Sequence, residues 1–327
     1  MAVVARSEEE HPPESPAAPL EAAIALGHAL VENLGRVLLG APDAVRSAAT
    51  AALCGGHLLI EDVPGVGKTV LARALAASLG TTLARVQGNP DLLPSDVTGV
   101  SVFSAEDGRW EFRSGPVFSN VVLVDELNRT PPRTQSALLE TMEEQQVTVD
   151  GESWPLPRPH LVVATQNPHT HLGTYPLVDS QLDRFALCTT IGYPDAETEA
   201  RLVRHDGGKF ALDHLAAVTD LARWSKAQRA TETVQVGEAV ARYAVDLARA
   251  TRHAAGVRLG ASPRASIWLV RAAQAHAVLS GRGYVVPGDV KAVAVDCLAH
   301  RLGAEHGIGQ SQAIVRELLD SVPAPRP

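Results

Sequence analysis

Residues 62–69 read DVPGVGKT and bring together the residue types that hold phosphate groups. Glycines let backbone N–H groups approach a phosphate closely, a lysine supplies a positive charge, and a threonine hydroxyl can bind Mg²⁺. An apolar run at 58–60 precedes this turn and leucines four residues apart follow it, so the turn is expected to join a buried strand to a helix. The pattern predicts a phosphate-binding turn made of consecutive residues: Asp62, Val63, Pro64, Gly65, Val66, Gly67, Lys68, Thr69 and Val70.

The first position of this turn departs from the strict pattern GxxxxGK(S/T). A glycine belongs six residues before Lys68, and Asp62 stands there. Aspartate adopts a left-handed backbone more readily than most residues, so the turn is expected to keep its shape. The competing interpretation is a chance glycine-rich turn between a strand and a helix, and the fit of both flanking patterns disfavours it.

A second run, 121–126, reads VVLVDE and places two carboxylates directly after four apolar residues. Such a run is typical of a central parallel strand that is buried on both faces. Ligands of open α/β sheets bind beyond the carboxyl ends of the strands, where Asp125 and Glu126 would lie. Taken alone, the run fits a buried strand ending in two solvated acids better, but its pairing with the phosphate-binding turn favours a functional site.

Composition and charge argue against several broad classes. The chain has 327 residues, 45% hydrophobic and 20% charged, which is ordinary for a globular protein and long enough for two domains. A net charge of −8 argues against a general nucleic-acid or membrane-surface binder. The widely separated Cys54, Cys188 and Cys297 show no metal or disulfide spacing. No apolar run approaches the roughly 18 residues of a membrane helix and no signal peptide is visible, so we expect a cytoplasmic protein.

The chain divides into three stretches by composition. Residues 1–19 are rich in glutamate and proline and are expected to form a disordered tail. Residues 20–194 alternate helical and strand patterns, which predicts an α/β domain with a parallel sheet, interrupted by two hairpins. Residues 195–327 lose the strand patterns, and their alanine-, leucine- and arginine-rich sequence predicts an all-helical domain. Within the α/β domain, Asp43 is expected to cap the second helix.

Several separated blocks, taken together and in order, resemble the MoxR family of AAA+ ATPases. The blocks are LIEDVPGVGKT, NPDLLPSDVTG, VDELNRTPPRTQSALLETMEEQQVTVDG, VVATQNP, GTYPL followed by QLDRF, and LGASPRAS followed by GRGYVVPGDV. The resemblance extends from about residue 20 to residue 301 and implies an AAA+ parallel-sheet P-loop ATPase core with a C-terminal all-helical lid domain. It implies ATP and Mg²⁺ as nucleotide and metal. The chain departs from the family pattern at a few positions: Asp62, Thr170, His171, Val178 and Asp179.

The resemblance also assigns roles near the phosphates and the base. Thr69 and Asp125 are expected to hold Mg²⁺, largely through water, and Glu126 is expected to orient the attacking water. A glutamate with an ordinary pKa near 4.3 is ionised at pH 7, so Glu126 suits an orienting acceptor better than a strong base. Leu39 and Gly40 fall where the family closes on adenine.

Three further residues match the family's sensors and arginine finger. Asn167 matches sensor 1, a neutral amide able to bridge the attacking water and the γ-phosphate. Arg184 matches the arginine finger that reaches the nucleotide of a neighbouring subunit, although an arginine before a strand is also a common solvated surface residue. Arg264 matches sensor 2 on the lid, and the sequence leaves open whether it acts on its own or a neighbour's nucleotide.

The implied assembly is a homo-oligomeric ring, expected to be a hexamer, that remodels partner proteins. The resemblance implies assistance in maturation or metal-cofactor insertion, often with a von Willebrand factor A domain partner, and neither nucleic acid nor a membrane span is expected. Two alternatives stay open: the ATPase subunit of a metal chelatase, and a nucleotide-gated assembly protein with little turnover. Arg129 is a weaker candidate for an interface arginine, and a zinc site at His169 and His171 is discounted for want of further ligands.

Overall fold

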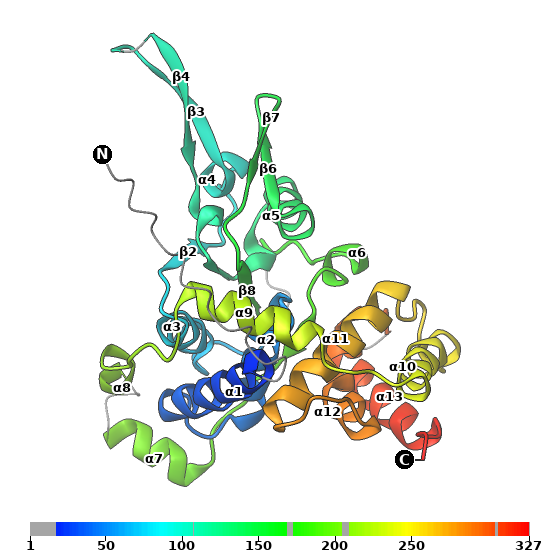
Figure 1. The fold of residues 1–327 in the computed structure, drawn as a ribbon. Coiled ribbons are helices and arrows are strands. Elements are labelled where there is room, and N and C mark those ends of the chain that lie inside the picture. Colours follow the sequence, from blue (N-terminus) through cyan, green and yellow to red (C-terminus); the bar gives the residue numbers. More distant parts are fainter. Residues whose placement is uncertain (1–17, 107, 169–172, 205–208, 305–306, 327) are drawn as a thin grey trace, which may run out of the picture.

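A five-stranded sheet with the order β2-β5-β8-β1-β9 forms the centre of the α/β part (Figure 1). The computed structural model describes residues 18–106, 108–168, 173–204, 209–304 and 307–326. Neighbouring strands of this sheet all pair in parallel, as predicted, so their carboxyl ends share one edge. The strands are β1 (Leu58–Glu61), β2 (Leu83–Gln87), β5 (Val121–Asp125), β8 (Leu161–Gln166) and β9 (Leu187–Thr189).

Burial on both faces of the sheet explains the continuous apolar runs in its strands. Leu58 and Ile60 pack into one hydrophobic cluster, whereas Leu59 packs into the cluster on the opposite face. The same alternation holds in β5, where Leu123 belongs to the first cluster and Val124 to the second. Because successive side chains point to opposite faces of a strand, only a run without polar residues suits a sheet that is covered on both sides.

The first cluster is covered by the helices α1 (Ala18–Val37), α2 (Pro42–Cys54) and α3 (Lys68–Ser78). Helix α1 begins two residues inside the segment expected as a tail. The predicted cap at Asp43 is wrong: Ala41 is the N-cap of α2, and Asp43 lies in its first turn. Pro42 explains the earlier start, because proline has a helical φ and lacks the N–H that would be unsatisfied at that position.

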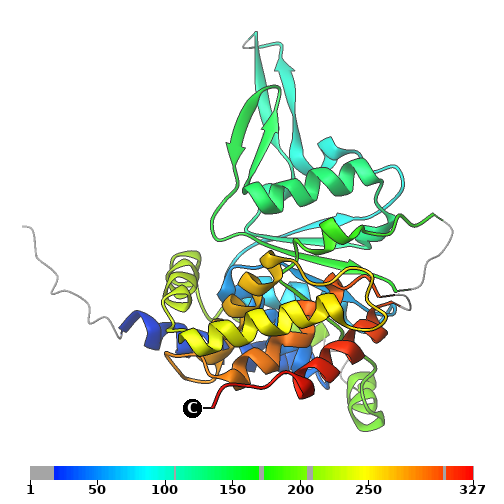
Figure 2. The same cartoon turned by 90° about the vertical axis from the view of Figure 1, so that its right-hand side faces the viewer.

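Two antiparallel hairpins project from the same side of the molecule (Figure 1 and Figure 2), and both were predicted. The first joins β3 (Gly99–Ser104) to β4 (Arg109–Ser114), and the second joins β6 (Gln146–Val149) to β7 (Glu152–Pro155). The rings of Phe112 and Trp154 stack with centroids 4.7 Å apart, so the hairpins contact each other. Near the hairpins in the sequence lie α4 (Pro94–Thr98), η1 (Pro116–Phe118), η2 (Leu127–Arg129) and α5 (Pro132–Glu144).

After β9 the described residues form helices and loops, and two isolated β-bridges pair residues of these loops. Except for the helix at Ala196–Arg204, which has no buried residue, these helices place residues in the first hydrophobic cluster with α1 and α2, and α9 and α11 contact both. Among the described residues, no helix is long and apolar enough to span a membrane. The elements from the end of the α/β part onward are α6 (Asp179–Leu182), α7 (Ala196–Arg204), α8 (Lys209–Asp213), α9 (Leu221–Glu232), α10 (Glu238–Ala250), η4 (Thr251–His253), α11 (Pro263–Leu279), α12 (Pro287–Leu298), η5 (Ala299–Arg301) and α13 (Ile308–Ser321).

Candidate functional site

The predicted phosphate-binding turn joins β1 to α3, with both flanking elements as expected. Gly65 and Gly67 have φ angles of 87° and 104°, a left-handed backbone that residues with a side chain rarely adopt. Gly67 is the N-cap of α3, and no side chain caps the helix. The first N–H groups of α3 therefore lack a side-chain acceptor, and they carry the positive end of the helix dipole. This arrangement fits a bound phosphate.

Lys68 opens α3, and its ammonium lies against the ends of β1 and β8. Its Nζ donates to the backbone carbonyl of Asp62, to that of Gln166 at 3.2 Å, and to Oδ1 of Asn167 at 2.7 Å. Burial lowers the pKa of Lys68, and the neighbouring carboxylates oppose this shift. The structure thus brings the predicted lysine and the predicted sensor 1 amide into direct contact.

The carboxylate of Asp125 lies at the end of β5 among three donors. Its Oδ1 accepts from Thr165 Oγ1 at 2.7 Å, and its Oδ2 accepts from Thr69 Oγ1 at 3.2 Å and from Arg85 Nη2 at 2.7 Å. Burial alone would raise the pKa of Asp125, but these hydrogen bonds outweigh it and hold the pKa below its usual range. A hydroxyl and a carboxylate side by side are the hard oxygen ligands that suit Mg²⁺.

Glu126 has a left-handed backbone, with φ of 56°, which is uncommon for a residue other than glycine. Its Oε1 accepts from Asn167 Nδ2 at 3.4 Å, and its Oε2 accepts from Arg129 Nη1 at 2.8 Å. Its backbone N–H donates to Thr165 Oγ1 at 2.9 Å. The carboxylate therefore lies beside the amide of Asn167, which contacts Lys68 through its oxygen.

Asp62 occupies the position where the strict pattern has glycine, and its side chain has a structural task. One carboxylate oxygen accepts from the backbone N–H groups of Ile191 and Gly192, both at 2.7 Å, and the other accepts from Val63 N–H at 2.7 Å. The expected reason for its tolerance is wrong, because Asp62 is not among the described residues with positive φ. Its carboxylate, rather than a left-handed backbone, anchors the start of the turn.

A pocket beside the phosphate-binding turn holds the two residues expected near adenine. Leu39 and Gly40 line it together with Gly65 and Gly67 of the turn. Ile191, Gly192, Pro194 and Leu202 form another part of the lining. Because Asp62 binds the N–H groups of Ile191 and Gly192, it connects the phosphate-binding turn to the opposite wall of this pocket.

Arg184 and Arg264 meet at a different place, on the carboxylate of Glu143. Arg184 Nε lies 3.3 Å from Glu143 Oε2, and Arg264 Nη2 contacts Glu143 Oε1. Among the described residues, neither guanidinium has a hydrogen bond or ion pair with residues 62–69. Their side chains are 27% and 40% exposed. Neither the meeting of these two arginines nor the acid between them was predicted.

Arg85 and Arg301 were also missed by sequence reasoning. Arg85 lies in β2, outside the motifs, and its contact with Asp125 comes from the parallel pairing of β2 with β5. Arg301 is buried and donates to the carboxylate of Asp183 at 2.9 Å and to the backbone of Phe185. An arginine inside a run of expected helix carries no signal that separates a buried role from a solvated one.

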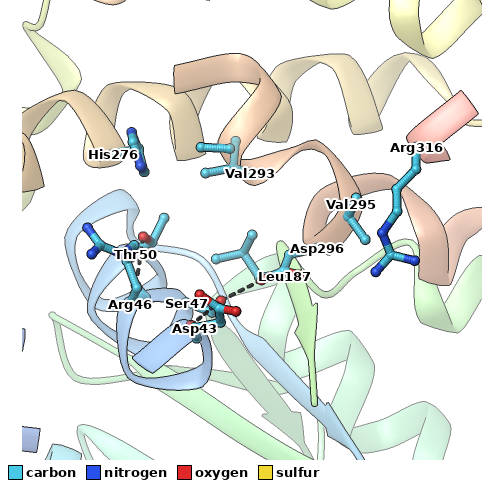
Figure 3. Close-up of a pocket in the computed structure, with 11 residues that line it drawn as sticks. Asp43, Arg46, Ser47, Thr50, Leu187, His276, Val293, Val295, Asp296 and Arg316 are labelled. Carbon is cyan, nitrogen blue, oxygen red and sulfur yellow. Dashed lines mark hydrogen bonds between the residues drawn. The ribbon is translucent and has the colours of Figure 1, made fainter. Parts of the chain in front are cut away.

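A second cavity, of about 260 Å³, lies between α2 and the C-terminal helices (Figure 3) and shares no lining residue with the pocket beside the phosphate-binding turn. Its polar lining includes Asp43, Ser47, Asp296 and Arg316. No group of three or more metal-binding side chains occurs among the described residues. His169 and His171 lie outside the described residues.

The AAA+ class of ATPases is defined by this arrangement: a parallel sheet with a glycine-rich turn after β1, carboxylates at the end of β5, an amide after the intervening β8, and a following set of helices. Family models agree: the ATPase family associated with various cellular activities (AAA) matches residues 57–187, and the AAA lid domain matches residues 249–318. The chain belongs to the MoxR family of AAA+ ATPases.

Individual relatives cover most of the chain. It is 45% identical over 300 residues to the uncharacterized protein YeaC of Bacillus subtilis, covering 90% of this chain and 93% of that protein. It is 39% identical over 279 residues to chaperone MoxR1 of Mycobacterium tuberculosis, covering 82% of this chain and 73% of that protein. A crystal structure of a protein from Cytophaga hutchinsonii is 34% identical with a TM-score of 0.84, covering 94% of this chain and 98% of that one.

Proposed function

We propose that this protein hydrolyses ATP with Mg²⁺ as a ring of identical subunits, expected to be hexameric, and uses the energy to remodel partner proteins. One observation carries the proposal: Lys68, Thr69, Asp125, Glu126 and Asn167 converge at the carboxyl edge of three adjacent strands. This convergence provides charge, metal ligands and a water-orienting acceptor within a single network of contacts.

Phosphoryl transfer to water depends mainly on positioning and on neutralising the charge of the phosphate oxygens. The ammonium of Lys68 exchanges its carbonyl contacts for β- and γ-phosphate oxygens, while N–H groups of the turn and of α3 hold the rest of the triphosphate. Mg²⁺, when bound, neutralises phosphate charge, and Thr69 and Asp125 are the residues that would hold it. The adenine base of ATP occupies the pocket lined by Leu39 and Gly40.

The attacking water is oriented by Glu126 and Asn167. The carboxylate of Glu126 accepts a hydrogen bond from the water and directs the water's lone pair toward the γ-phosphate. Asn167 contacts both Glu126 and Lys68, so it fixes the orienting acid relative to the phosphate-binding charge. The amide is neutral at any working pH, so its own charge does not change during the reaction.

The neighbouring subunit completes the site through Arg184. Within the described residues this arginine forms an ion pair with Glu143 and has no hydrogen bond or ion pair with its own phosphate-binding turn, which suits a residue that serves another subunit's nucleotide. Arg264 shares the same carboxylate, so we assign it to the same intersubunit face. Protein remodelling is supported by the relative described as a chaperone. A von Willebrand factor A domain protein, metal-cofactor insertion and a cytoplasmic location belong to the same proposal.

A turnover assay with Glu126→Gln tests this function. The wild-type protein should release phosphate from ATP with Mg²⁺ and stop when the metal is chelated, whereas Glu126→Gln should bind ATP normally and turn over at least a hundredfold more slowly. Glu140→Gln, at an exposed position on α5, is the matched control and should behave as wild type. Absence of Mg²⁺-dependent phosphate release from the assembled wild-type protein, or normal turnover by Glu126→Gln, contradicts the proposal.

A further inference from the structure

Glu143 joins three elements that are far apart in the sequence. It lies in the last turn of α5, where its two carboxylate oxygens contact different arginines. Arg184 follows α6, and Arg264 is the second residue of α11. One acidic side chain of the ATPase core therefore contacts both the predicted arginine finger and the predicted sensor 2 residue.

The charges around Glu143 do not balance, because two guanidinium groups share one carboxylate. Each guanidinium has five N–H donors in a fixed plane. The contact with Glu143 uses Nε of Arg184 and Nη2 of Arg264. Within the described part of the chain no other hydrogen bond or ion pair of either guanidinium is found, so the remaining donors of each group can bind an anion. Two arginines this close repel each other unless an acid lies between them. Glu143 thus keeps two cations side by side without saturating either of them.

The backbones that carry the two arginines are held by a separate set of contacts. Asp183 accepts hydrogen bonds from Ser262 Oγ at 2.9 Å and from Arg301 Nε at 2.9 Å, so the residues preceding Arg184 and Arg264 are tied together. Glu143 takes no part in this network. Removing its charge should therefore leave the backbones in place and change only where the two guanidinium groups point.

We propose that Glu143 is the positioning residue that holds Arg184 and Arg264 as a pair facing the ATP of the neighbouring subunit. This inference rests on the function proposed above, in which Arg184 acts across the subunit interface. A phosphate bears more negative charge than a carboxylate and offers several oxygens, so it binds the free donors of both arginines while Glu143 keeps their spacing. A misplacement of about 1 Å in such a group costs up to about a hundredfold in rate.

The variant Glu143→Gln separates positioning from binding. It removes the charge and keeps the size of the side chain, so kcat should fall about tenfold to a hundredfold while KM and the affinity for ATP stay within about twofold of wild type. Glu143→Asp keeps the charge and should recover part of the lost kcat. Glu144→Gln is the matched control, because Glu144 is the next residue of α5, is exposed and contacts Gln146 rather than an arginine. Thermal unfolding of all three variants should match wild type.

A double variant tests whether Glu143 acts through Arg264. If it does, the loss of kcat in Glu143→Gln with Arg264→Ala should be smaller than the product of the two single losses. The proposal is overturned if the two single losses of kcat multiply in the double variant, or if Glu143→Gln keeps the wild-type kcat. It is also overturned if Glu143→Gln is faster than wild type, because Glu143 would then shield the arginines. The function proposed above fails through different outcomes: an inactive wild-type protein or a fully active Arg184→Ala variant. If the wild type is active, Arg184→Ala is inactive and Glu143→Gln has a normal kcat, only the role of Glu143 is refuted.

Discussion

Arg85 donates a 2.7 Å hydrogen bond to the carboxylate of Asp125, the residue proposed to hold Mg²⁺. The guanidinium comes from the neighbouring strand β2, and it supplies the positive charge that a divalent cation would bring to the same carboxylate. If Asp125 holds Mg²⁺ as proposed, Arg85 and the cation would compete for its carboxylate. Arg85 and Asp125 are 40 positions apart in the sequence, so only the folded structure brings them together.

Arg85→Gln should lower the Mg²⁺ concentration needed for half-maximal nucleotide binding. The side chain of Arg85 is 54% exposed, so solvent screens the ion pair and the shift should be up to about fivefold, equivalent to about 1 kcal/mol. A titration of Mg²⁺ with a fluorescent ATP analogue measures it. The matched control is Arg73→Gln, which removes an exposed ion pair with Asp213 on the outer side of α3. An unchanged or higher Mg²⁺ requirement in Arg85→Gln refutes the competition.

Asp62→Gly restores the strict phosphate-binding pattern and should nevertheless weaken the protein. The glycine removes the acceptor of three backbone N–H groups, in Val63, Ile191 and Gly192. Hydrogen bonds to charged groups contribute about 1.5–3 kcal/mol each. Because Asp62 is only partly buried, we expect the free energy of unfolding to fall by about the value of one such bond or more, with weaker ATP binding. Denaturant unfolding and an ATP titration measure the two effects. A glycine variant as stable as wild type, with equal ATP affinity, would show that the carboxylate has no anchoring role.

The sequence predicted the elements that depend on local patterns and missed the contacts that depend on chain topology. Apolar runs located the strands, and the spacing of glycines, lysine and acids located the phosphate edge, because those signals lie within a few consecutive residues. The partners of Asp62 lie 129 and 130 positions away. Arg264 and Glu143 are 121 positions apart, and no pattern within either segment points to the other.

Stability should depend on pH through Asp296 of α12, whose carboxylate accepts a hydrogen bond from Ser47 of α2 at the cavity between the two helices (Figure 3). Burial raises the pKa of Asp296 from 3.8 to about 6, with a contribution from Asp43, while the hydroxyl of Ser47 and the charge of Arg316 oppose the shift. Arg46 and His276 also line this cavity. A pKa that is higher in the folded state means that folding favours the protonated acid.

The contribution of Asp296 to stability is therefore complete below about pH 4 and is lost as the pH rises through about 6. Asp296→Asn keeps a polar partner for Ser47 and cannot ionise. The free energy of unfolding of the variant minus that of wild type should be about 2–3 kcal/mol larger at pH 8 than at pH 4. This follows from the pKa shift of Asp296 at about 1.36 kcal/mol per pKa unit. Denaturant unfolding at the two pH values measures this difference, and a gap between the proteins that does not change with pH contradicts it.

The central claim is that each ATP site is shared by two subunits, and two inactive variants isolate the two halves. Lys68→Ala should lose ATP binding with its fold intact, while Lys291→Ala, at an exposed position on α12, should bind normally. Arg184→Ala should bind ATP and lose turnover by on the order of 10³ or more, the range found for arginine fingers. Each variant keeps the half of the site that the other has lost.

Mixing the two inactive variants tests this claim most directly. In a ring assembled at random from equal amounts, a subunit with intact Lys68 meets a neighbour with intact Arg184 at about one site in four. Subunit exchange is verified first by energy transfer between labelled proteins, and phosphate release is then measured on the mixture. We predict that turnover returns to as much as about a quarter of the wild-type rate per subunit. A mixture that exchanges subunits yet stays inactive, together with an Arg184→Ala protein that is active alone, would contradict a shared site.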